Sequence, residues 1–314
     1  MNPLSLAYGA VTYLRNLVYG TRFFSAELRG PVVSVGSISA GGAGKTPLVL
    51  LLGELLKQRQ VPFDVLSRGY GRKSKGVRLV DPAGEAAEFG DEPLLIARRL
   101  GVPVVIGENR YHAGLFAEQR FRPQLHLLDD GFQHRALARD FDIALLTGVD
   151  LHDRLLPAGR LREPQSALAR ADVVAVSNAI PSSSIPSSRP SWWLRRRTIP
   201  PEPAPAKLIV VCGIARPNAF LEDLASAGVA IADKLAFPDH HNYTQHDIEQ
   251  LLQLRDAKAA EGFITTEKDF INLGSLAAAL RPLAIAKVEM KLEDADQCIT
   301  GMLETVAARH RARS

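Results

Sequence analysis

Cysteines and long apolar runs are scarce in this chain of 314 residues. The two cysteines, Cys212 and Cys298, do not have the paired spacing of a zinc or iron site. We therefore expect two buried thiols in a reducing compartment. No run of about 18 apolar residues is present, so the sequence predicts no membrane-spanning helix.

An excess of one charge is also missing. The formal net charge is only +4, so the overall composition does not favour a nucleic-acid partner. Basic residues cluster locally at 68–75 and at 195–197, and we interpret the second cluster as a solvated face. A hydrophobic content of 46% is typical of a soluble globular protein with a full core.

The most informative motif present is a glycine-rich loop between a strand pattern and a helix pattern. The loop comprises Ser39, Ala40, Gly41, Gly42, Ala43, Gly44, Lys45 and Thr46. An apolar β-branched run precedes it and a helical pattern follows it, which is the context of a phosphate-binding P-loop. Its glycines allow backbone N–H groups to surround phosphate oxygens. In such loops Lys45 would reach the β- and γ-phosphates and the Thr46 hydroxyl would bind Mg²⁺.

The loop has one departure from the strict pattern, because Ser39 stands where that pattern has glycine. The identity of the nucleotide follows from a missing motif. GTPases recognise guanine with an Asn-Lys-x-Asp sequence, which does not occur, and Thr266-Glu-Lys-Asp269 has the wrong order. We therefore favour ATP over GTP.

Apolar strands and helices alternate along the first half of the chain. We expect strands at 31–35, 63–66, 77–80, 102–106, 125–128, 141–146 and 172–177, and helices at 47–57, 91–100 and 110–120. Such alternation with short connections predicts an α/β fold with a mostly parallel sheet and helices on both of its faces. The P-loop places this fold with the P-loop NTPases.

Composition divides the chain into four predicted parts. Residues 31–178 form the nucleotide-binding core, and residues 207–314 form a smaller C-terminal α/β portion. The Pro/Ser-rich segment 179–206 is a poor candidate for sheet or helix, and we interpret it as a linker.

The remaining part, residues 1–30, contains apolar groups on most of a helical surface at 4–19. This helix could pack on the core. It could also lie in a membrane interface, with Arg15, Arg22 and Arg29 facing anionic lipid.

Two acidic sites have both a chemical and a structural interpretation. Asp129 and Asp130 directly follow an apolar strand, the position from which a Walker-B carboxylate binds Mg²⁺. The alternative is a plain Asp-Gly turn, in which two adjacent carboxylates repel each other. Asp91 stands at the start of a predicted helix, and its spacing alone favours an N-cap.

Two further sites also have alternatives. Adjacent histidines rarely bind one ion, so one ring of Asp239-His240-His241 is a better candidate for a general base, or for a surface histidine. Arg162 could contact a phosphate, or it could form a structural ion pair with Glu163.

Taken together, these segments resemble the tetraacyldisaccharide 4′-kinases, the lipid A 4′-kinases of Gram-negative bacteria. The matching motifs occur in the family's order across almost the whole chain, at 14–19, 41–47, 67–72, 90–93, 108–110, 128–134, 156–164, 213–217, 237–241 and 265–269. Leu128-Asp-Asp-Gly-Phe-Gln-His134 and Leu156-Pro-Ala-Gly-Arg-Leu-Arg-Glu-Pro164 are highly specific. The family also has serine where Ser39 stands.

The resemblance implies transfer of the γ-phosphoryl group of ATP to the 4′-hydroxyl of a tetraacyldisaccharide 1-phosphate, which gives lipid IVA. It implies that Asp91 and His240 form a catalytic dyad, with His240 preferred to His241 because the family motif centres on Asp-His. The other implied roles are metal binding by Thr46, Asp129 and Asp130, charge compensation by Lys45 and Arg162, and substrate binding by Arg68, Tyr70 and Arg72.

The resemblance also implies a location at the cytoplasmic face of the inner membrane, on which the N-terminal helix rests. The C-terminal portion would complete the active site. Two other functions remain open from the motifs, a P-loop ATPase switch that binds a protein and a peripheral membrane scaffold with a vestigial loop. The switch leaves the histidines at 240 and 241 without a role, and the intact Lys45, Thr46 and Asp130 disfavour the scaffold.

Overall fold

The computed structural model describes residues 3–5, 8–9, 11–12, 25–177, 180–186, 188–201 and 207–313. The N-terminal helix expected within residues 1–30 therefore lies largely outside the described residues. Among the few described there, Leu4 and Val11 are exposed, and the Ser5 hydroxyl donates to the Leu155 carbonyl. Of the helices that the structure describes, none has the length and apolar character needed to cross a bilayer.

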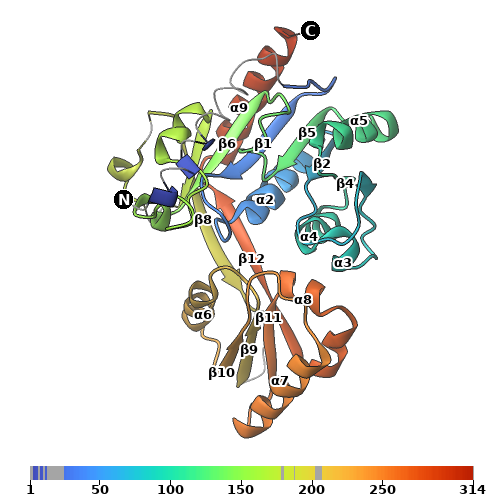
Figure 1. The fold of residues 1–314 in the computed structure, drawn as a ribbon, viewed down its shortest axis with the longest axis vertical. Helices are drawn as coiled ribbons and strands as arrows, with labels where there is room; N and C mark the ends of the chain where they lie inside the picture. Colours follow the sequence, from blue (N-terminus) through green and yellow to red (C-terminus); the bar gives the residue numbers. More distant parts are fainter. Residues whose placement is uncertain are drawn as a thin grey trace.

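A twelve-stranded sheet runs through the molecule in the order β10-β9-β11-β12-β8-β7-β6-β1-β5-β2-β4-β3 (Figure 1). The strands are β1 (Val32–Ser37), β2 (Phe63–Ser67), β3 (Arg78–Leu79), β4 (Val104–Ile106), β5 (Leu125–Asp129), β6 (Phe141–Leu146), β7 (Val173–Ser177), β8 (Ser191–Ile199), β9 (Leu208–Cys212), β10 (Ile231–Ala236), β11 (Gly262–Thr266) and β12 (Leu283–Leu292). The helices are α2 (Lys45–Gln58), α3 (Ala86–Phe89), α4 (Asp91–Leu100), α5 (Arg110–Phe121), α6 (Pro217–Ser226), α7 (Gln245–Ala257), α8 (Glu267–Leu273) and α9 (Ala295–Arg311).

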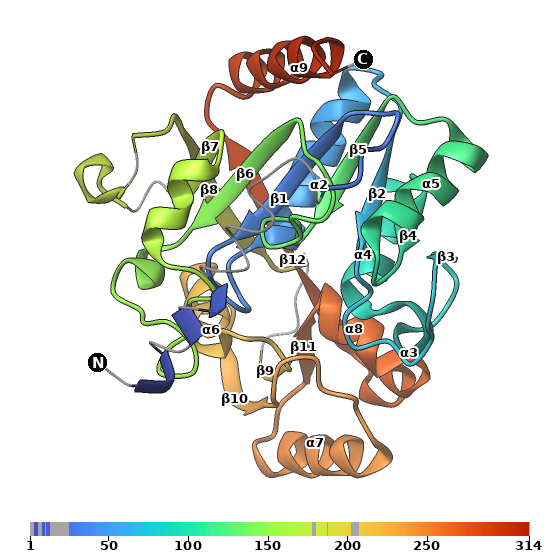
Figure 2. The ribbon, with the colours of Figure 1, turned by 45° about the horizontal axis from the view of Figure 1, so that its top comes forward.

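Two lobes share this sheet (Figure 1). The P-loop lobe contains β1–β7 with α2–α5 and α9, and the second lobe contains β9–β11 with α6–α8. The long strands β8 and β12 pair in antiparallel fashion and cross from one lobe to the other, whereas most other pairs are parallel. In Figure 2, α9 lies at one end of the molecule and α7 at the other. The mostly parallel α/β fold predicted from the sequence is confirmed.

Alternating residues of the central strand β1 reach opposite faces of the sheet. Val33 and Val35 belong to the core that packs against α2, α4 and α9. Val32 belongs to the core that packs against α5. All six residues of β1 are buried, as expected for a parallel strand with helices on both faces. This burial fixes the strand from which the P-loop begins.

The interpretation of residues 179–206 as a linker without regular structure is wrong for nine of them. Ser191–Ile199 forms β8, which pairs with β7 on one side and β12 on the other. Proline stands directly before and after this strand but not within it, and Trp192, Leu194 and Thr198 are buried at even spacing. The composition of the whole segment concealed this short alternating pattern. The predicted division of the chain into four parts otherwise stays a prediction.

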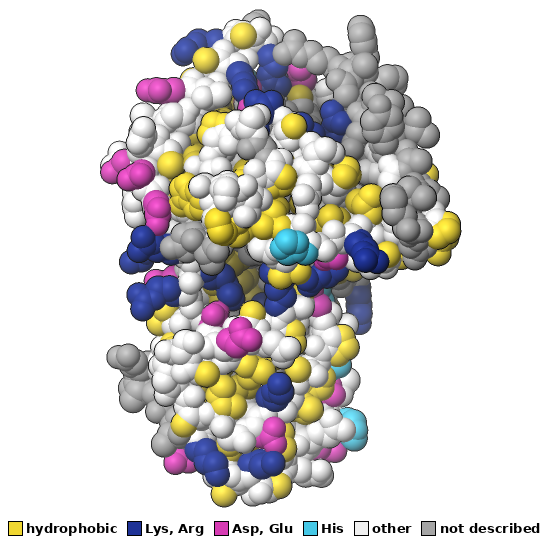
Figure 3. Space-filling view, turned by 90° about the vertical axis from the view of Figure 1, so that its left-hand side faces the viewer, with side chains coloured by type: hydrophobic (Ala, Val, Ile, Leu, Met, Phe, Trp, Pro, Cys, Tyr) yellow, Lys and Arg dark blue, Asp and Glu magenta, His cyan; other side chains and the backbone are white. Residues whose placement is uncertain are grey.

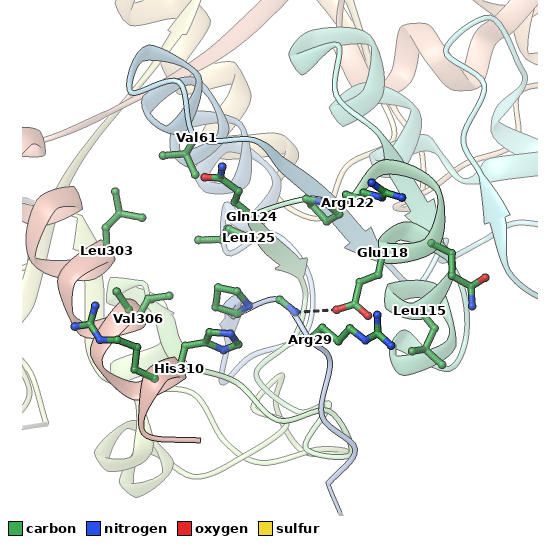
Figure 4. A pocket seen from close by; sticks show the side chains of 16 residues that line it. Arg29, Val61, Leu115, Glu118, Arg122, Gln124, Leu125, Leu303, Val306 and His310 are labelled. Carbon is green, nitrogen blue, oxygen red and sulfur yellow. Dashed lines mark hydrogen bonds between the residues drawn. The ribbon is translucent and has the colours of Figure 1, made fainter. Parts of the chain in front are cut away.

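A groove of about 950 Å³ lies at the amino ends of β1 and β5, between α5 and α9 (Figure 4). Glu118 of α5 lines it and accepts a hydrogen bond of 2.8 Å from the Gly30 backbone N–H. Beneath the groove, Nδ1 of the buried His126 lies 2.8 Å from Asp64 Oδ1, and its Nε2 lies 3.4 Å from Glu118 Oε1. Burial alone would lower the pKa of His126, but Asp64 and Glu118 hold it above its ordinary value. The ring thus joins two acidic partners from separate elements, Asp64 of β2 and Glu118 of α5.

We expect replacement of His126 by leucine to cost about 3–5 kcal/mol of unfolding free energy, because Asp64 would be left buried without its partner. Urea denaturation followed by circular dichroism measures this. The double variant Asp64→Leu/His126→Leu is the matched control, and it should recover part of the loss since it leaves no unpaired charge. A single variant as stable as the parent chain would contradict the expectation.

Candidate active site

The P-loop emerges from the centre of the sheet and has the backbone that its glycines predict. Gly41, Gly42 and Gly44 have φ angles of 66°, 61° and 92°, in the left-handed region that favours glycine. Gly44 is the N-cap of α2, so the loop passes directly into the positive end of that helix. Lys45 and the buried Thr46 are the first two residues of the helix.

The segment 154–163 runs beside this loop and holds it in place. The Ala40 N–H donates to the Arg160 carbonyl at 2.8 Å, and the Arg162 N–H donates to the Ile38 carbonyl at 2.7 Å. Glu163 is fully buried and pairs with Arg170 at 2.7 Å. Arg162, for which a structural ion pair was the alternative to a phosphate contact, pairs with Asp130 at 3.0 Å.

Lys45 and Arg162 converge on one carboxylate. Lys45 Nζ lies 3.4 Å from Asp130 Oδ1, and Arg162 Nη1 donates to Asp130 Oδ2 at 3.0 Å. Burial alone would raise the pKa of Asp130, but the two cations hold it below its ordinary value. Asp130 is thus an ionised group between two cations at the edge of the P-loop.

Asp129 is the last residue of β5 and lies opposite Val35 of β1. It is buried, and its Oδ2 accepts a hydrogen bond of 2.9 Å from the Ser67 hydroxyl. No group in the described part of the chain hydrogen-bonds the other oxygen, Oδ1, although that atom is also buried. Burial, together with the charges of Glu92 and Asp130, raises the pKa of Asp129 to about 7. A cation beside this carboxylate would stabilise its ionised form and lower the pKa of Asp129 again.

These residues fit a magnesium ion. The Thr46 hydroxyl and the carboxylates of Asp129 and Asp130 offer the hard oxygen ligands that Mg²⁺ prefers. The described residues contain no cluster of three or more His, Cys, Asp or Glu side chains that could hold a metal ion. An Mg²⁺ ion that is bound together with substrate phosphates needs only one or two carboxylates from the protein.

Asp91 is the first residue of α4, and Gly90 rather than Asp91 is the N-cap. The interpretation of Asp91 as a simple N-cap is therefore wrong. Its buried carboxylate accepts from Asn272 Nδ2 at 2.9 Å and lies 2.9 Å from His240 Nδ1. Burial alone would raise the pKa of Asp91, but His240 and Lys268 hold it below its ordinary value. Asp91 is thus kept as a carboxylate.

The two adjacent histidines point to different partners. His240 reaches Asp91, whereas His241 Nε2 lies 3.0 Å from Asp247 and its ring stacks on Phe237. Burial alone would lower the pKa of His240, but Asp91 raises it above its ordinary value while Lys268 opposes that rise. The geometry therefore favours His240 over His241 as the histidine of the site.

Two side chains of α8 meet the same carboxylate, and the sequence had not indicated a role for either. Lys268 Nζ lies 2.9 Å from Asp239 Oδ1, 3.2 Å from His240 Nε2 and 3.9 Å from Asp91 Oδ2. Asn272 follows four residues later and donates to Asp91. Lys268 lies in the family motif at 265–269, whereas Asn272 lies beyond it and shares with Lys268 only the i,i+4 spacing of one helix face.

The second lobe also covers the P-loop. A Cβ atom on Gly41 would lie 3.4 Å from Ala215 Cβ and 3.7 Å from Asp239 Oδ2. A Cβ atom on Gly42 would lie 3.0 Å from Arg216 Cγ. Figure 3 shows Lys and Arg side chains gathered at the waist where the two lobes meet. The site is thus built from both lobes.

The segment after β2 contains two arginines in different environments, one exposed to solvent and one in an ion pair. Arg68 is exposed, whereas Arg72 Nη2 donates to Glu108 Oε1 at 2.7 Å and its side chain is almost fully buried. Arg72, expected as a substrate-binding residue, is thus turned toward Glu108. The exposed Tyr70 ring lies 5.1 Å from the ring of His240.

Arg110 and His134 lie near Arg68, and the sequence analysis assigns no role to either, although they belong to the family motifs at 108–110 and 128–134. Burial and the charge of Arg68 lower the pKa of Arg110 to about 10, and the carboxylates of Asp129 and Asp130 oppose this shift. Burial, together with Arg110 and nearby arginines, lowers the pKa of His134 to about 3, so that ring is neutral. The Arg68–Arg110–His134 group is a candidate site for an anion beside Asp129 and Asp130.

Comparisons with known proteins place this chain in one family. The family model for tetraacyldisaccharide-1-P 4′-kinase matches residues 1–307. The tetraacyldisaccharide 4′-kinase of Koribacter versatilis is 45% identical over 320 residues, covering 98% of this chain and 99% of that protein. The enzyme of the same name from Geobacter metallireducens is 38% identical and covers 93% of each chain. A crystal structure of an "apo" form of LpxK from Aquifex aeolicus in complex with ATP superposes with a TM-score of 0.77, at 32% identity and 97% coverage of both chains.

Proposed function

This chain belongs to the tetraacyldisaccharide 4′-kinase family, and on that premise we propose that it transfers the γ-phosphoryl group of ATP to the 4′-hydroxyl of a tetraacyldisaccharide 1-phosphate, giving lipid IVA in lipid A biosynthesis. One observation supports this most directly. The Asp91–His240 pair is assembled from both lobes, and Asp239 beside it lies against Gly41 of the P-loop. A carboxylate–imidazole pair at this place can receive the proton of an attacking hydroxyl.

In the proposed reaction, Asp91 takes the proton of the 4′-hydroxyl as that oxygen forms its bond to the γ-phosphorus. The bond between that phosphorus and the β,γ-bridging oxygen breaks, and ADP departs. His240 donates its Nδ1–H to Asp91 and orients the carboxylate. Lys45 and Arg162 offset the negative charge on the transferring group.

Thr46, Asp129 and Asp130 would hold the metal in this scheme. A bound Mg²⁺ would supply further compensation for the negative charge of the phosphates. The backbone N–H groups of the P-loop would bind the phosphates of ATP.

We further propose that the lipid's 1-phosphate binds near the Arg68–Arg110–His134 group, with Tyr70 beside the sugar. Arg68→Ala should raise the KM for the lipid by about 10- to 100-fold, because a charged hydrogen bond to phosphate contributes about 1.5–3 kcal/mol. The KM for ATP should stay near its original value, as measured by steady-state kinetics with one substrate varied at a time. An equal rise in both KM values would place Arg68 outside a lipid-specific site.

The proposed substrate bears acyl chains, so the enzyme must meet it at a membrane surface. We propose that the N-terminal segment lies in the cytoplasmic leaflet of the inner membrane, with its basic residues toward anionic headgroups.

The direct test of the proposed function uses γ-labelled ATP and tetraacyldisaccharide 1-phosphate in mixed micelles. Label should appear in the lipid. Label that appears only as inorganic phosphate would overturn the proposal and would favour a P-loop ATPase switch.

A further inference from the structure

The second lobe places a half-buried lysine, Lys268, against the outer nitrogen of the histidine that contacts Asp91. Lys268 Nζ lies 3.2 Å from His240 Nε2, and the ring's other nitrogen faces Asp91. Three carboxylates surround the same ammonium, with Asp239 at 2.9 Å, Glu92 at 3.8 Å and Asp91 at 3.9 Å. These carboxylates keep Lys268 charged, since they raise its pKa although burial alone would lower it.

An ammonium group has three donors and no acceptor. The Lys268–His240 contact is therefore a hydrogen bond only when His240 Nε2 is unprotonated and accepts. The ring proton must then be on Nδ1, the nitrogen that lies 2.9 Å from Asp91 Oδ2. A doubly protonated ring would direct an N–H group at the ammonium. Lys268 thus favours the Nδ1–H tautomer and opposes a second proton on the ring. Asp91, and Asp239 with its Oδ2 3.8 Å from Nε2, act in the opposite direction and favour that proton.

The helix that carries Lys268 is itself fixed on α4, the helix that carries Asp91. Glu267 accepts two hydrogen bonds from Arg99 Nη1, at 2.7 and 2.8 Å. Asn272, one turn after Lys268, donates to Asp91 at 2.9 Å. The helix α8 therefore contacts α4 both just before Lys268 and one turn after it. The packing of α8 against α4, which belong to different lobes, sets the position of the lysine.

We propose that Lys268 is a positioning residue, which holds His240 as the neutral tautomer that donates Nδ1–H to Asp91. The inference rests on the proposed kinase function for its catalytic consequence, but the tautomer itself is a property of the free protein. Lys268 acts through His240 and does not need to contact either substrate.

Loss of the lysine charge should raise the pKa of both His240 and Asp91. Without Lys268, His240 becomes easier to protonate and Asp91 also becomes easier to protonate, because both lose a nearby cation. The active form requires a neutral ring and an ionised carboxylate. The acid-side midpoint of the kcat profile should therefore move to higher pH.

The test compares Lys268→Met with Lys268→Arg and with Glu267→Gln. In Lys268→Met, kcat at neutral pH should fall by up to about 100-fold, as expected for a misplaced reacting group, with the KM for ATP little changed. Its acid-side midpoint should rise, and Lys268→Arg should retain part of the activity because it keeps the charge. Glu267→Gln is the matched control, since it loosens the same helix contact without removing the cation, and its midpoint should not move.

Long-range ¹H–¹⁵N correlation spectra of the histidine rings supply the second readout on the free protein. His240 should show the Nδ1–H tautomer in the parent chain and should lose that preference in Lys268→Met. An unchanged tautomer together with an unshifted pH profile in the variant would overturn the inference. Failure of the parent chain to phosphorylate the lipid would instead overturn the proposed function, and the spectra would still report on Lys268.

Discussion

Replacement of Asp91 by alanine should lower the turnover number by about 10²–10⁴-fold, the contribution typical of a positioned general base. The carboxylate is buried, ionised, and fixed by hydrogen bonds from His240 and Asn272. It lies on α4, whereas the groups proposed to bind phosphate lie on the P-loop and α2. ATP binding should therefore be largely retained. Single-turnover kinetics, with separate titration of a fluorescent nucleotide analogue, distinguish the two effects.

The adjacent histidines provide the matched control for this prediction. His240→Ala should resemble Asp91→Ala in kcat, whereas His241→Ala should keep most of its activity because that ring contacts Asp247 and Phe237 instead. If Asp91 and His240 act as a unit, the double variant should lose little more than either single variant. Turnover near that of the parent chain in Asp91→Ala would remove the carboxylate from the mechanism.

The local parts of this site could be predicted from the sequence because each depends on residues close together in the chain. The P-loop glycines occupy the left-handed conformations that the motif requires, and α4 has the bounds expected from its pattern, 91–100. The carboxylate at 129 ends the buried strand β5 next to β1 and the one at 130 follows it, as their position after an apolar run indicates. In each case short-range spacing determines the geometry.

Contacts between the lobes could not be predicted from short-range spacing in the sequence. Asp91 and His240 are 149 positions apart, and only the resemblance to a family indicated that they meet. Nothing in the pattern of α8 shows that Lys268 and Asn272 reach Asp91, because that depends on how α8 packs against α4. The error at β8 has a different cause, since flanking prolines dominated the composition of a segment whose centre alternates between buried and exposed residues.

Asp129 at the end of β5 and Asp130 after it should contribute unequally to the affinity for Mg²⁺. In both carboxylates Oδ1 is buried and has no hydrogen-bond partner in the described part of the chain. Asp130, however, forms ion pairs with Lys45 and Arg162, whereas Asp129 forms none with the cations that the structure describes. Burial of an uncompensated carboxylate is costly, and a cation at Oδ1 would remove that cost. We therefore expect Asp129 to be the stronger determinant of Mg²⁺ affinity.

Asp129→Asn should accordingly lower kcat by about 10²–10³-fold at a fixed Mg²⁺ concentration, the cost typical of losing one preorganised group that stabilises transition-state charge. It should also raise the Mg²⁺ concentration needed for half-maximal activity. Asp130→Asn should chiefly raise the KM for ATP, because Lys45 and Arg162 would lose the carboxylate that holds them together beside the P-loop. Rates measured across a Mg²⁺ titration at saturating and at limiting ATP separate these effects. If the Mg²⁺ requirement rises in Asp130→Asn and not in Asp129→Asn, the two roles must be exchanged, and the buried oxygen of Asp129 then serves to orient Ser67 at the end of β2.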